Sequence, residues 1–518
     1  MTIEGKGMTG DDIATRGASA QTRSAPARRA VGARLIVVTL TATALAGCVV
    51  GPDYQKPFLA MPASWSGHNK ATPAKPAQLS KWWQRLRDPE LNTLVDEAVA
   101  GNLDVATAKA KIREARASYR QSSGALFPSV DGSGSVTRNK SAATTSGSST
   151  IYSEYQAGFD ASWELDLFGA NHRSVEAARY GLDASEEELR STLLTLVGDV
   201  ASYYAQARGY QARVALARRS AASQRQTAEL TRTMAQAGTA TAADVAKAMG
   251  QASSTEADIP TLEASYAEAV HRLSVLTGRP PAALSERLKR GAPIPAPRLP
   301  IPTGIPADIL LARPDVRMAE RQYAQYTAKV GQAEAARYPS VSLTGDISTS
   351  AYKLGDLGKN SSIGWSFGPT LSVPVFNAGQ LKAAVEVAKA QRDQYFIAYR
   401  SSVLSALEDV ENALVLLSQE RIRIGKLASS AKSYGEAARI EGTLFKAGET
   451  SLLDVLDAQR SLYSAEDSLL QSRVLLATNY IALNKALGGG WDGVVDTTTP
   501  EIMDVKTGPR LVSKAVVQ

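Results

Sequence analysis

Residues 155–165 read YQAGFDASWEL, in which apolar side chains alternate with polar or small ones. Tyr155 and Trp163 share one face of a strand, while Asp160 and Glu164 share the other, because successive side chains along a strand point to opposite sides. Two structures fit this pattern: a half-buried strand of a soluble sandwich, or a membrane-spanning strand with an apolar outer face and a polar lumen. The strand is long enough to span the hydrocarbon layer and carries carboxylates on its polar face, so we favour a transmembrane β-barrel.

The same alternation recurs along the chain, and the predicted strands come in two pairs. These are 130–137 with 155–165, and 341–347 with 363–373. Segments rich in glycine, serine and threonine, at 141–149 and 355–362, are typical of the hairpin loops between them. Four strands cannot close a barrel, because known barrels start at about eight strands and an open edge leaves unpaired backbone groups in lipid. The chain is therefore expected to combine its strands with those of further copies.

Each strand pair belongs to one half of a tandem repeat, with a spacing of about 210 residues. Phe127-Pro128-Ser129-Val130 recurs as Tyr338-Pro339-Ser340-Val341, and Ala237-Gly238-Thr239 recurs as Ala447-Gly448-Glu449. After each pair, apolar residues follow the 4-3-4-3 spacing of a coiled coil. Residues 171–236 contain no proline, so at ~1.5 Å per residue they predict a helix about 100 Å long. Such a helix suits a periplasmic tunnel; the alternative, a local helical hairpin on a globular domain, is disfavoured because the pattern occurs twice.

These patterns divide the chain into six parts. They are a lipoprotein signal peptide (1–47), an N-terminal lipidated extended segment (48–88), a first repeat (89–290), a proline-rich connector (291–306), a second repeat (307–490) and a C-terminal tail (491–518). Each repeat is expected to hold a helix, a strand pair and a long helical hairpin. The prolines between the repeats favour an extended connector.

The N-terminus has the features of a lipoprotein signal. Three arginines between positions 28 and 34 precede the apolar run 35–46, which stops at Cys48. The residues LAGC that end in this cysteine fit a lipobox, whose thiol is acylated, and Val49 at the next position is typical of bacterial lipoproteins that are sorted to the outer membrane. The chain has one cysteine, so disulfide bonds are excluded. The alternative is an ordinary signal peptide with a chance cysteine.

The composition argues against most kinds of chemistry. The net charge of +7 is not gathered into a basic run with interleaved aromatic residues, so nucleic acid is not an expected partner. The three histidines, His68, His172 and His271, lie far apart and lack further metal ligands at suitable spacing. The sequence has no phosphate-binding loop and no nucleophile elbow. We therefore expect no catalysis, no metal site, and no cofactor besides the covalent lipid on Cys48.

A series of motifs along the mature chain resembles the outer membrane factors, the TolC-like and NodT-type lipoproteins of tripartite efflux systems. The motifs are VGPDY (50–54), WW (82–83) with DPEL (88–91), WELDLFG (163–169), RPDVR (313–317), PVFNAG (374–379), GETSLLDVLDAQ (448–459) and ALGGGW (486–491). Their order and spacing carry the resemblance, which covers nearly all of the mature sequence.

The resemblance implies a mixed α and β membrane protein that works as a homotrimer. Each chain would give four strands to a twelve-stranded transmembrane β-barrel, which a long periplasmic α-helical coiled-coil barrel continues. The implied function is that of a passive outer-membrane channel, lipid-anchored and membrane-spanning, that receives substrates from an inner-membrane pump of the resistance-nodulation-division type through a periplasmic adaptor (membrane fusion) protein. A type I secretion duct is the close alternative, and a non-conducting structural lipoprotein is a more distant one.

The resemblance also assigns roles to residues at two hairpin tips, near 236–243 and 446–451. An adaptor would dock at Gly238, Thr239, Gly448 and Glu449, and Asp454 and Asp457 would form the periplasmic gate. In relatives, a tyrosine and an arginine on the second hairpin bind the aspartate of the first hairpin that matches Asp244, and these contacts lock the closed state. Here Phe445 and Thr450 occupy the positions of that tyrosine and arginine, so the polar lock cannot form in the same way.

Without the resemblance, Asp454 and Asp457 are better interpreted as helix-start residues, favoured there by the helix dipole. Their spacing of three residues places both carboxylates on one face of a helix. In a trimer they would form a ring around one axis, in which repulsion between like charges is expected to attract cations and to raise the pKa of the carboxyl groups.

Overall fold

A computed structural model describes residues 49–60, 79–141, 149–297, 307–500, 502–505 and 508–511. The signal peptide, Cys48 and His68 lie outside the described residues, as do parts of the connector and of the tail. All elements named below belong to one unit, Val49–Gln518.

The tandem repeat is visible in the order and the lengths of the elements. The first half contains α2 (Pro89–Gly101), α3 (Leu103–Gly124), β1 (Ser129–Lys140), β2 (Ile151–Leu165), α4 (Ala170–Gln236) and α5 (Ala242–Leu276). The second half contains α7 (Pro314–Ala335), β3 (Ser340–Ala351), β4 (Ile363–Ser372), α8 (Gln380–Ala447) and α9 (Leu452–Ala486). The helices α4 and α8 have 67 and 68 residues, and α5 and α9 have 35 each, so the lengths of the helices repeat together with their order.

Short elements precede, connect and follow these parts. They are η2 (Trp82–Leu86), α6 (Ser285–Leu288), η3 (Ala307–Ala312), η4 (Leu354–Asp356), η5 (Asn360–Ser362), β5 (Ile502–Val505) and β6 (Gly508–Leu511). The segment 48–88 was expected to be extended, but η2 interrupts it because Trp82 and Trp83 are buried in the main core.

The first repeat opens with two helices where one was expected. Asn102 separates α2 from α3 with an extended backbone, and its side-chain oxygen accepts hydrogen bonds from the amides of Asp104 and Val105. Its Nδ2 donates to the carbonyl of Leu276 at the end of α5, 3.0 Å away. The break therefore serves both as the cap of α3 and as a fixed point against α5.

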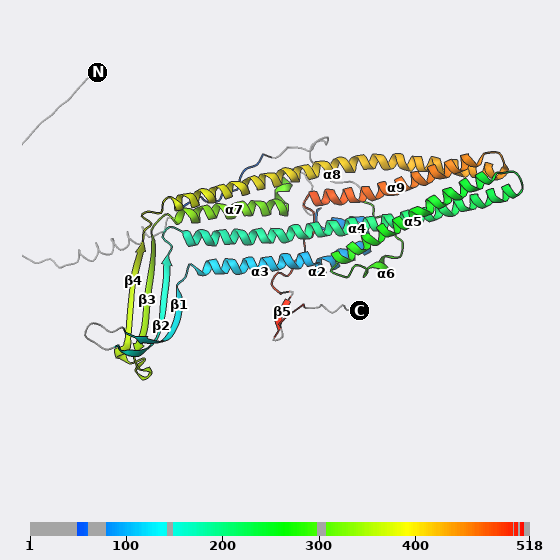
Figure 1. Cartoon of the computed structure of the whole chain (residues 1–518). Coiled ribbons are helices and arrows are strands. Elements are labelled where there is room, and N and C mark those ends of the chain that lie inside the picture. Colours follow the sequence, from blue (N-terminus) through cyan, green and yellow to red (C-terminus); the bar gives the residue numbers. More distant parts are fainter. Residues whose placement is uncertain are drawn as a thin grey trace, which may run out of the picture. The chain divides into compact units, whose positions relative to one another are not determined.

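Strands β1 to β4 form one antiparallel sheet in the order β1-β2-β3-β4 (Figure 1), and β5 pairs with β6 in a separate two-stranded sheet. Phe159 of β2 lies opposite Gly132 and Ile347, whereas the next residue, Asp160, lies opposite Asp131 and Asp346. Since directly opposite residues share a face, one face of the sheet is apolar and the other is polar and acidic. Within the described part of the chain, β1 and β4 pair on one side only, so the sheet is open at both edges.

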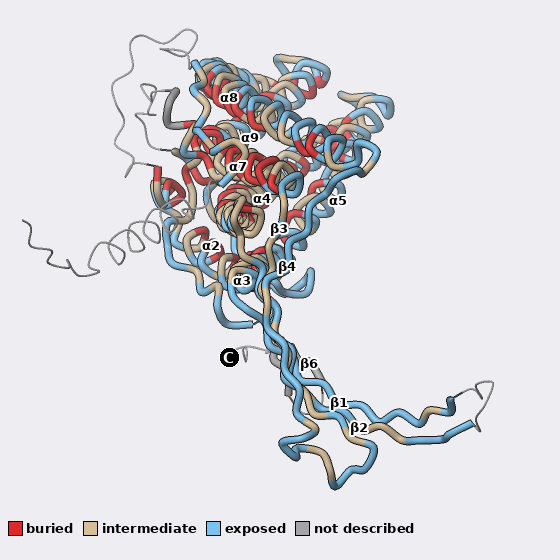
Figure 2. Tube along the Cα trace, turned by 90° about the vertical axis from the view of Figure 1, so that its left-hand side faces the viewer, coloured by how far each residue is buried: buried red, intermediate tan, exposed pale blue. Residues whose placement is uncertain are grey.

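The helices extend from one end of the sheet, and α4 is their centre. It packs against α2, α3, α5, α7 and α9, while α8 packs against α7 and α9. Figure 2 shows that the buried residues gather in the helices, whereas β1 to β4 contain only exposed and half-buried residues. Among the described helices, none has both the length and the apolar content that crossing a membrane requires.

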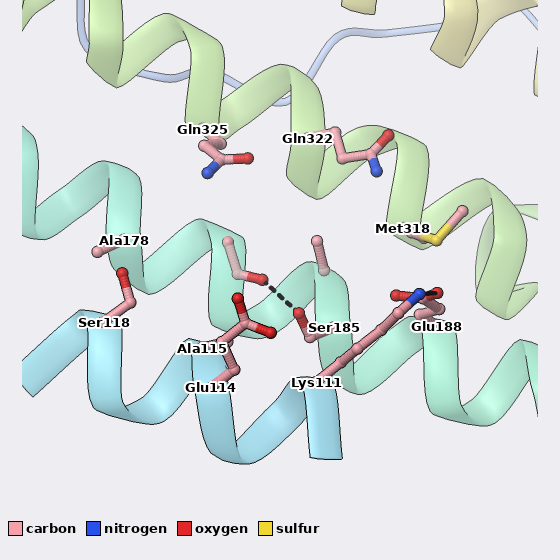
Figure 3. Close-up of a pocket in the computed structure, with 12 residues that line it drawn as sticks. Lys111, Glu114, Ala115, Ser118, Ala178, Ser185, Glu188, Met318, Gln322 and Gln325 are labelled. Carbon is pink, nitrogen blue, oxygen red and sulfur yellow. Dashed lines mark hydrogen bonds and ion pairs between the residues drawn. The ribbon is translucent and has the colours of Figure 1, made fainter. Parts of the chain in front are cut away.

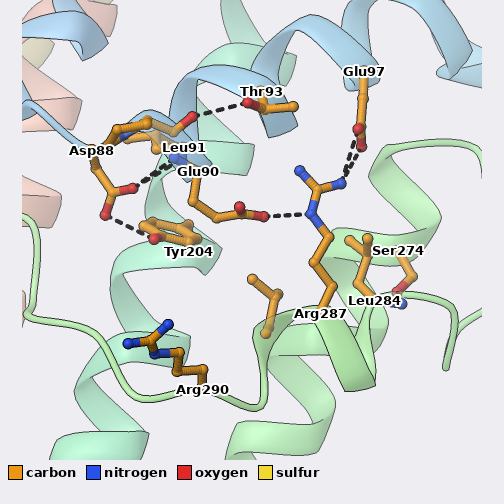
Figure 4. A network of polar contacts seen from close by, with 12 residues as sticks. Asp88, Glu90, Leu91, Thr93, Glu97, Tyr204, Ser274, Leu284, Arg287 and Arg290 are labelled. Atoms are coloured by element: carbon orange, nitrogen blue, oxygen red, sulfur yellow. Dashed lines mark hydrogen bonds and ion pairs between the residues drawn. The ribbon is translucent and has the colours of Figure 1, made fainter.

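A polar network fixes the start of α2 against α4 and α6 (Figure 4). Asp88 accepts hydrogen bonds from the backbone amides of Glu90 and Leu91, and its other oxygen accepts one from the hydroxyl of Tyr204, 2.7 Å away. Arg287 of α6 forms ion pairs with Glu90 at 2.6 Å and with Glu97 at 2.9 Å. The motif around Asp88 thus has a structural role, as a helix cap that also orders the buried tyrosine.

Candidate functional site at the helical hairpin tips

The two hairpin tips reverse the chain with the same local structure. Gly238 and Gly448 have φ of +80° and +75°, in the left-handed region that favours glycine. The amide of the residue after each glycine donates back to the helix, from Thr239 to Met234 and from Glu449 to Leu444, both at 2.9 Å. All four predicted docking residues, Gly238, Thr239, Gly448 and Glu449, are exposed, and Figure 1 shows the two tips side by side at the end of the helices that is remote from the sheet.

A hydroxyl residue caps the helix that follows each tip, Thr241 before α5 and Ser451 before α9, and an aspartate three residues later binds its hydroxyl group. Thr241 donates from Oγ1 to the carboxylate of Asp244, 2.7 Å away, and accepts from the amide of Asp244. In the second repeat, Ser451 donates to Asp454 at 2.6 Å, and Thr450 lies 3.2 Å from the same oxygen. These hydroxyl groups stabilise the charged carboxylates and hold the pKa of Asp244 and of Asp454 below the usual value.

Asp454 and Asp457 share an exposed face at the start of α9, as their spacing predicts. Asp457 pairs with Arg460 one turn further along the same helix. Within one chain, the hydroxyl groups of Ser451 and Thr450 favour the ionised form of Asp454; the rise of its pKa that repulsion in a trimer would cause stays a prediction.

The residues of the predicted lock do not meet through polar contacts. Thr241 and Lys247, both on its own side of the hairpin, are the partners of Asp244 in the described structure. Thr450 is 2.9 Å from Glu441 and thus stays within its own hairpin as well. The absence of the relatives' lock in the assembled channel stays a prediction, because these contacts are those within a single chain.

An apolar cluster joins the two hairpins just above the tips. Phe445 at the end of α8 is only 6% exposed and packs with three residues of α9, Leu452, Val455 and Leu456. Ala228 of α4 and Ala248 of α5 complete the cluster from the other hairpin. Phe445 cannot bind Asp244 as the tyrosine of the relatives does, but it makes an apolar contact between the two hairpins. We call this group, the six residues named, the tip cluster.

Further from the tips, one face of α9 carries polar contacts to the first hairpin. Gln459 donates to Thr227 of α4 at 2.9 Å, and the hydroxyl of Tyr463 donates to Asp258 of α5 at 3.0 Å. Asp467 follows at the same spacing of four residues, which keeps all three on one side of the helix. We call Gln459, Tyr463 and Asp467 the α9 polar stripe. Sequence reasoning missed it, although the spacing of four was a detectable signal.

A polar recess of about 410 Å³ lies among α3, α4 and α7 (Figure 3). The ion pair of Lys111 with Glu188, 2.5 Å long, stands at one side, and Gln322 and Gln325 face it from α7. No sequence motif predicted this recess. Among the described residues, no group of three or more histidine, cysteine, aspartate or glutamate side chains is arranged to hold a metal ion.

Exposed apolar side chains gather at both ends of the sheet. At the helix end lie Phe127, Tyr338, Val375 and Phe376, of which Phe376 is 89% exposed; we call these four the helix-end girdle. At the hairpin end, the rings of Tyr152 and Tyr352 contact each other edge to face, with centroids 5.4 Å apart. Between the two ends one face of the sheet is apolar, which is the arrangement that a membrane-spanning barrel requires of its lipid-facing side.

Both repeats match one protein family. Residues 94–279 and 305–489 match the family described as outer membrane efflux protein. The chain belongs to this family.

Relatives and solved structures of outer membrane efflux proteins resemble the chain over most of its length. Nodulation protein T of Rhizobium leguminosarum bv. trifolii is 37% identical over 458 residues, which cover 87% of this chain and 96% of that protein. Cation efflux system protein CusC of Escherichia coli is 32% identical over 453 residues, with 87% and 97% covered. The structure of the outer-membrane channel OprN superimposes with a TM-score of 0.77 at 32% identity and covers 86% of this chain and all of that one.

Family membership confirms several predictions from the sequence. The chain is an outer-membrane efflux channel protein, and it combines long helices with four strands per chain as such channels do. The structure of the Campylobacter jejuni channel CmeC, with a TM-score of 0.80 at 25% identity, supports the same fold. The assignments of individual residues at the tips remain predictions.

Proposed function

We propose that three copies of this chain form the exit duct of a tripartite efflux system and conduct substrates passively across the outer membrane. The open sheet carries this proposal, because an unpaired strand edge in lipid leaves backbone groups without partners, each of which costs several kcal/mol. Three copies supply twelve strands, which closes the barrel at both edges. The apolar face then meets lipid, and the acidic face with Asp131, Asp160 and Asp346 lines the lumen.

Disulfide cross-linking between the two edge strands tests this assembly. A chain with Ser135→Cys on β1 and one cysteine placed in turn along β4 is expected to form covalent trimers through β1–β4 contacts between copies. The control pair, Ser135→Cys with Gln156→Cys, joins residues that are opposite each other within one chain, so it gives no covalent oligomer. A purified protein that is monomeric in detergent and never conducts in a planar bilayer would contradict the proposal.

A periplasmic adaptor protein would bind at the hairpin tips and connect the duct to an inner-membrane pump of the resistance-nodulation-division type. The tips are suited to this because they are exposed, repeated in each chain and remote from the sheet. Relatives are named for solvent, toluene and cation efflux, so the family spans cargoes of unlike chemistry. Cysteines at Thr239 and Glu449 are expected to cross-link to the adaptor, whereas a cysteine at Glu436, on the exposed side of α8 away from the tip, is expected not to.

Asp454 and Asp457 would form the narrow acidic ring of the gate, and Asp244, Phe445 and Thr450 would shape its closed state. Support comes from the exposed common face of the two aspartates and from the tip cluster, which ties the two hairpins together where the channel has to narrow. Because the polar stripe also joins the hairpins, opening would require α8 and α9 to separate from α4 and α5.

An acyl chain on Cys48 would anchor the mature chain in the membrane. The lipobox supports this, as does the relative SilC of Salmonella typhimurium, 33% identical over 454 residues and described as a probable outer membrane lipoprotein. Replacement of Cys48 with serine is expected to abolish palmitate incorporation. Equal incorporation in the variant and the wild type would contradict the anchor.

A further inference from the structure

The first residues after Cys48 contact both α4 and α7. The amide of Val50 donates to the carbonyl of Phe168, just beyond β2, at 3.1 Å. The aromatic ring of the same Phe168 stacks on Tyr338 of the helix-end girdle, with centroids 4.8 Å apart. We call residues Val49–Tyr54 the N-terminal strap. It begins at the boundary between the sheet and the helices, and α4 and α7 belong to different repeats, so it spans the seam between them.

Arg173, in the first turn of α4, binds the strap through its guanidinium group. Its Nε donates to the carbonyl of Val50 and one terminal nitrogen donates to the carbonyl of Gly51, both at 3.2 Å. The same terminal nitrogen lies 2.7 Å from the carboxylate of Asp53, and the other lies 2.7 Å from Glu176 of its own helix. Arg173 is only 4% exposed. A guanidinium is buried at a large cost in free energy unless its donors are satisfied, and the strap supplies three of the four acceptors.

Three glycines make room for this contact, one on each participating segment. A Cβ on Gly51 of the strap would lie 2.3 Å from the Cα of Gly331 on α7, and a Cβ on Gly331 would lie 2.7 Å from the Nε of Arg173. A Cβ on Gly169, in the turn before α4, would lie 2.7 Å from Val49. Distances below 3.0 Å are not compatible with packed atoms, so the strap fits only because all three positions lack a side chain.

Tyr54 provides a second fixed point further from the sheet. Its hydroxyl donates to the carboxylate of Glu320, which is buried on α7. Its ring contacts Tyr180 of α4 and Tyr323 of α7 edge to face, with centroids 5.6 and 5.8 Å apart. The strap is therefore held at both ends, across both helices.

We propose that the N-terminal strap is a rigid tether, with Arg173 as its positioning residue, that fixes where the lipid anchor leaves the protein. This rests on the proposed acylation of Cys48. A flexible segment of about 12 residues would let the anchor move over roughly 20 Å. Val50, which Arg173 and Phe168 hold by hydrogen bonds, lies only two residues from the modified position, so the anchor is confined much more closely. The acyl chains then enter the membrane beside the helix-end girdle, so that anchor and girdle contact lipid at one level.

A spin label at the exposed position Gln55 tests the tether in the full-length protein in lipid vesicles. The only native cysteine is the acylation site, so Gln55→Cys gives a unique free thiol. Arg173→Met is expected to increase the mobile fraction of the label about tenfold, because hydrogen bonds to a charged group are lost. The control Arg179→Met, an exposed arginine on the same helix, is expected to leave the label immobile. Equal mobility in the wild type and in Arg173→Met would overturn the proposal.

A second variant keeps the test decisive if Arg173→Met fails to fold. Gly51→Ala changes only the strap, and the added Cβ is expected to expel it from Gly331 while α4 and α7 stay packed; an immobile label in this variant would also overturn the proposal. Palmitate incorporation, measured in the same samples, tests the anchor separately. If Arg173 immobilises the strap but the chain incorporates no palmitate, the proposed anchor is overturned. The strap would then only hold the two repeats together.

Discussion

Arg213 of α4 forms a two-point ion pair with Asp467 of α9, with Nε–Oδ1 and Nη2–Oδ2 distances of 2.6 and 3.0 Å. Both side chains are mostly buried, at 22% and 18% exposed. It is the strongest of the contacts made by the α9 polar stripe, because paired, charge-assisted hydrogen bonds in a partly desolvated site exceed neutral ones. Any movement that separates the two hairpins along their length has to break it.

Loss of this ion pair is expected to favour the open channel. Arg213→Met removes both hydrogen bonds and leaves Asp467 partly buried with Gln471 as its remaining partner, which costs the closed state about 1.5 to 3 kcal/mol. The open fraction in planar bilayers is therefore expected to rise about tenfold or more. The matched control is Arg439→Met, since Arg439 makes a two-point pair with Glu436 inside α8 and spans no interface. Equal opening in both variants would show that the α4–α9 contact does not hold the channel closed.

The tip cluster is expected to be a second support of the closed state. Phe445→Ala removes a buried ring, and substitutions of this kind cost about 3 kcal/mol or more in a packed core. The start of α9 is expected to exchange its amide hydrogens faster and the resting conductance is expected to increase. Leu453→Ala is the control, because Leu453 lies in the first turn of α9, beside Leu452 of the tip cluster, but is 67% exposed. A leak of the same size in both variants would assign the effect to the helix start and not to the cluster.

The turn at Gly448 is expected to depend on backbone conformation alone. Gly448 has φ of +75° and no atom within 4 Å of a Cβ placed there, so Gly448→Ala meets no clash but costs about 1 to 2 kcal/mol through the left-handed conformation. Gly442→Ala, in the helical part of α8 and equally free of neighbours, is expected to be neutral or slightly stabilising. Cross-linking to the adaptor from Glu449 should fall in the first variant only; a loss in both would point to α8 itself.

Much of the fold could be predicted because it depends on periodic patterns that the sequence contains. Alternation over residues 155–165 defines the two faces of β2, and the proline-free span 171–236 predicts α4 almost to the residue. The duplication then predicts β3, β4 and α8 from the first half. The separation of α2 from α3 escaped prediction because it depends on a contact of Asn102 with the end of α5, which is distant in sequence.

The candidate site could be predicted only in part, for the same reason. Gly238 and Gly448 mark the tips, because a reversal between helices favours glycine wherever it occurs. The tip cluster and the ion pair of Arg213 with Asp467 join helices that are remote in the chain, so no local pattern reveals the partner. Arg173 follows the same rule: it looks like any arginine at a helix start until the strap is placed over it.

Asp454 and Asp457 are expected to make the resting channel selective for cations. They are also expected to make it sensitive to block by trivalent cations added on the periplasmic side. Two carboxylates per chain, brought around one axis by three chains, attract cations and exclude anions. Asp454→Asn with Asp457→Asn keeps a side chain that can cap the helix, so the fold is retained while the charge is lost. The reversal potential in a salt gradient is expected to shift towards zero, and block by the trivalent cation to disappear.

The pH dependence of this selectivity separates the two influences on Asp454. The hydroxyl groups of Ser451 and Thr450 lower the pKa of Asp454 from its usual value, so its charge is present at neutral pH and is lost only as the pH falls through that lowered value. Repulsion between copies acts in the opposite direction and would move the loss of selectivity to a higher pH.

Glu436→Gln is the control for the double variant, because it breaks a similar i, i+3 pair with arginine away from the tip. If the double variant and the wild type give the same reversal potential and the same block, both aspartates are helix-start residues and the gate lies elsewhere.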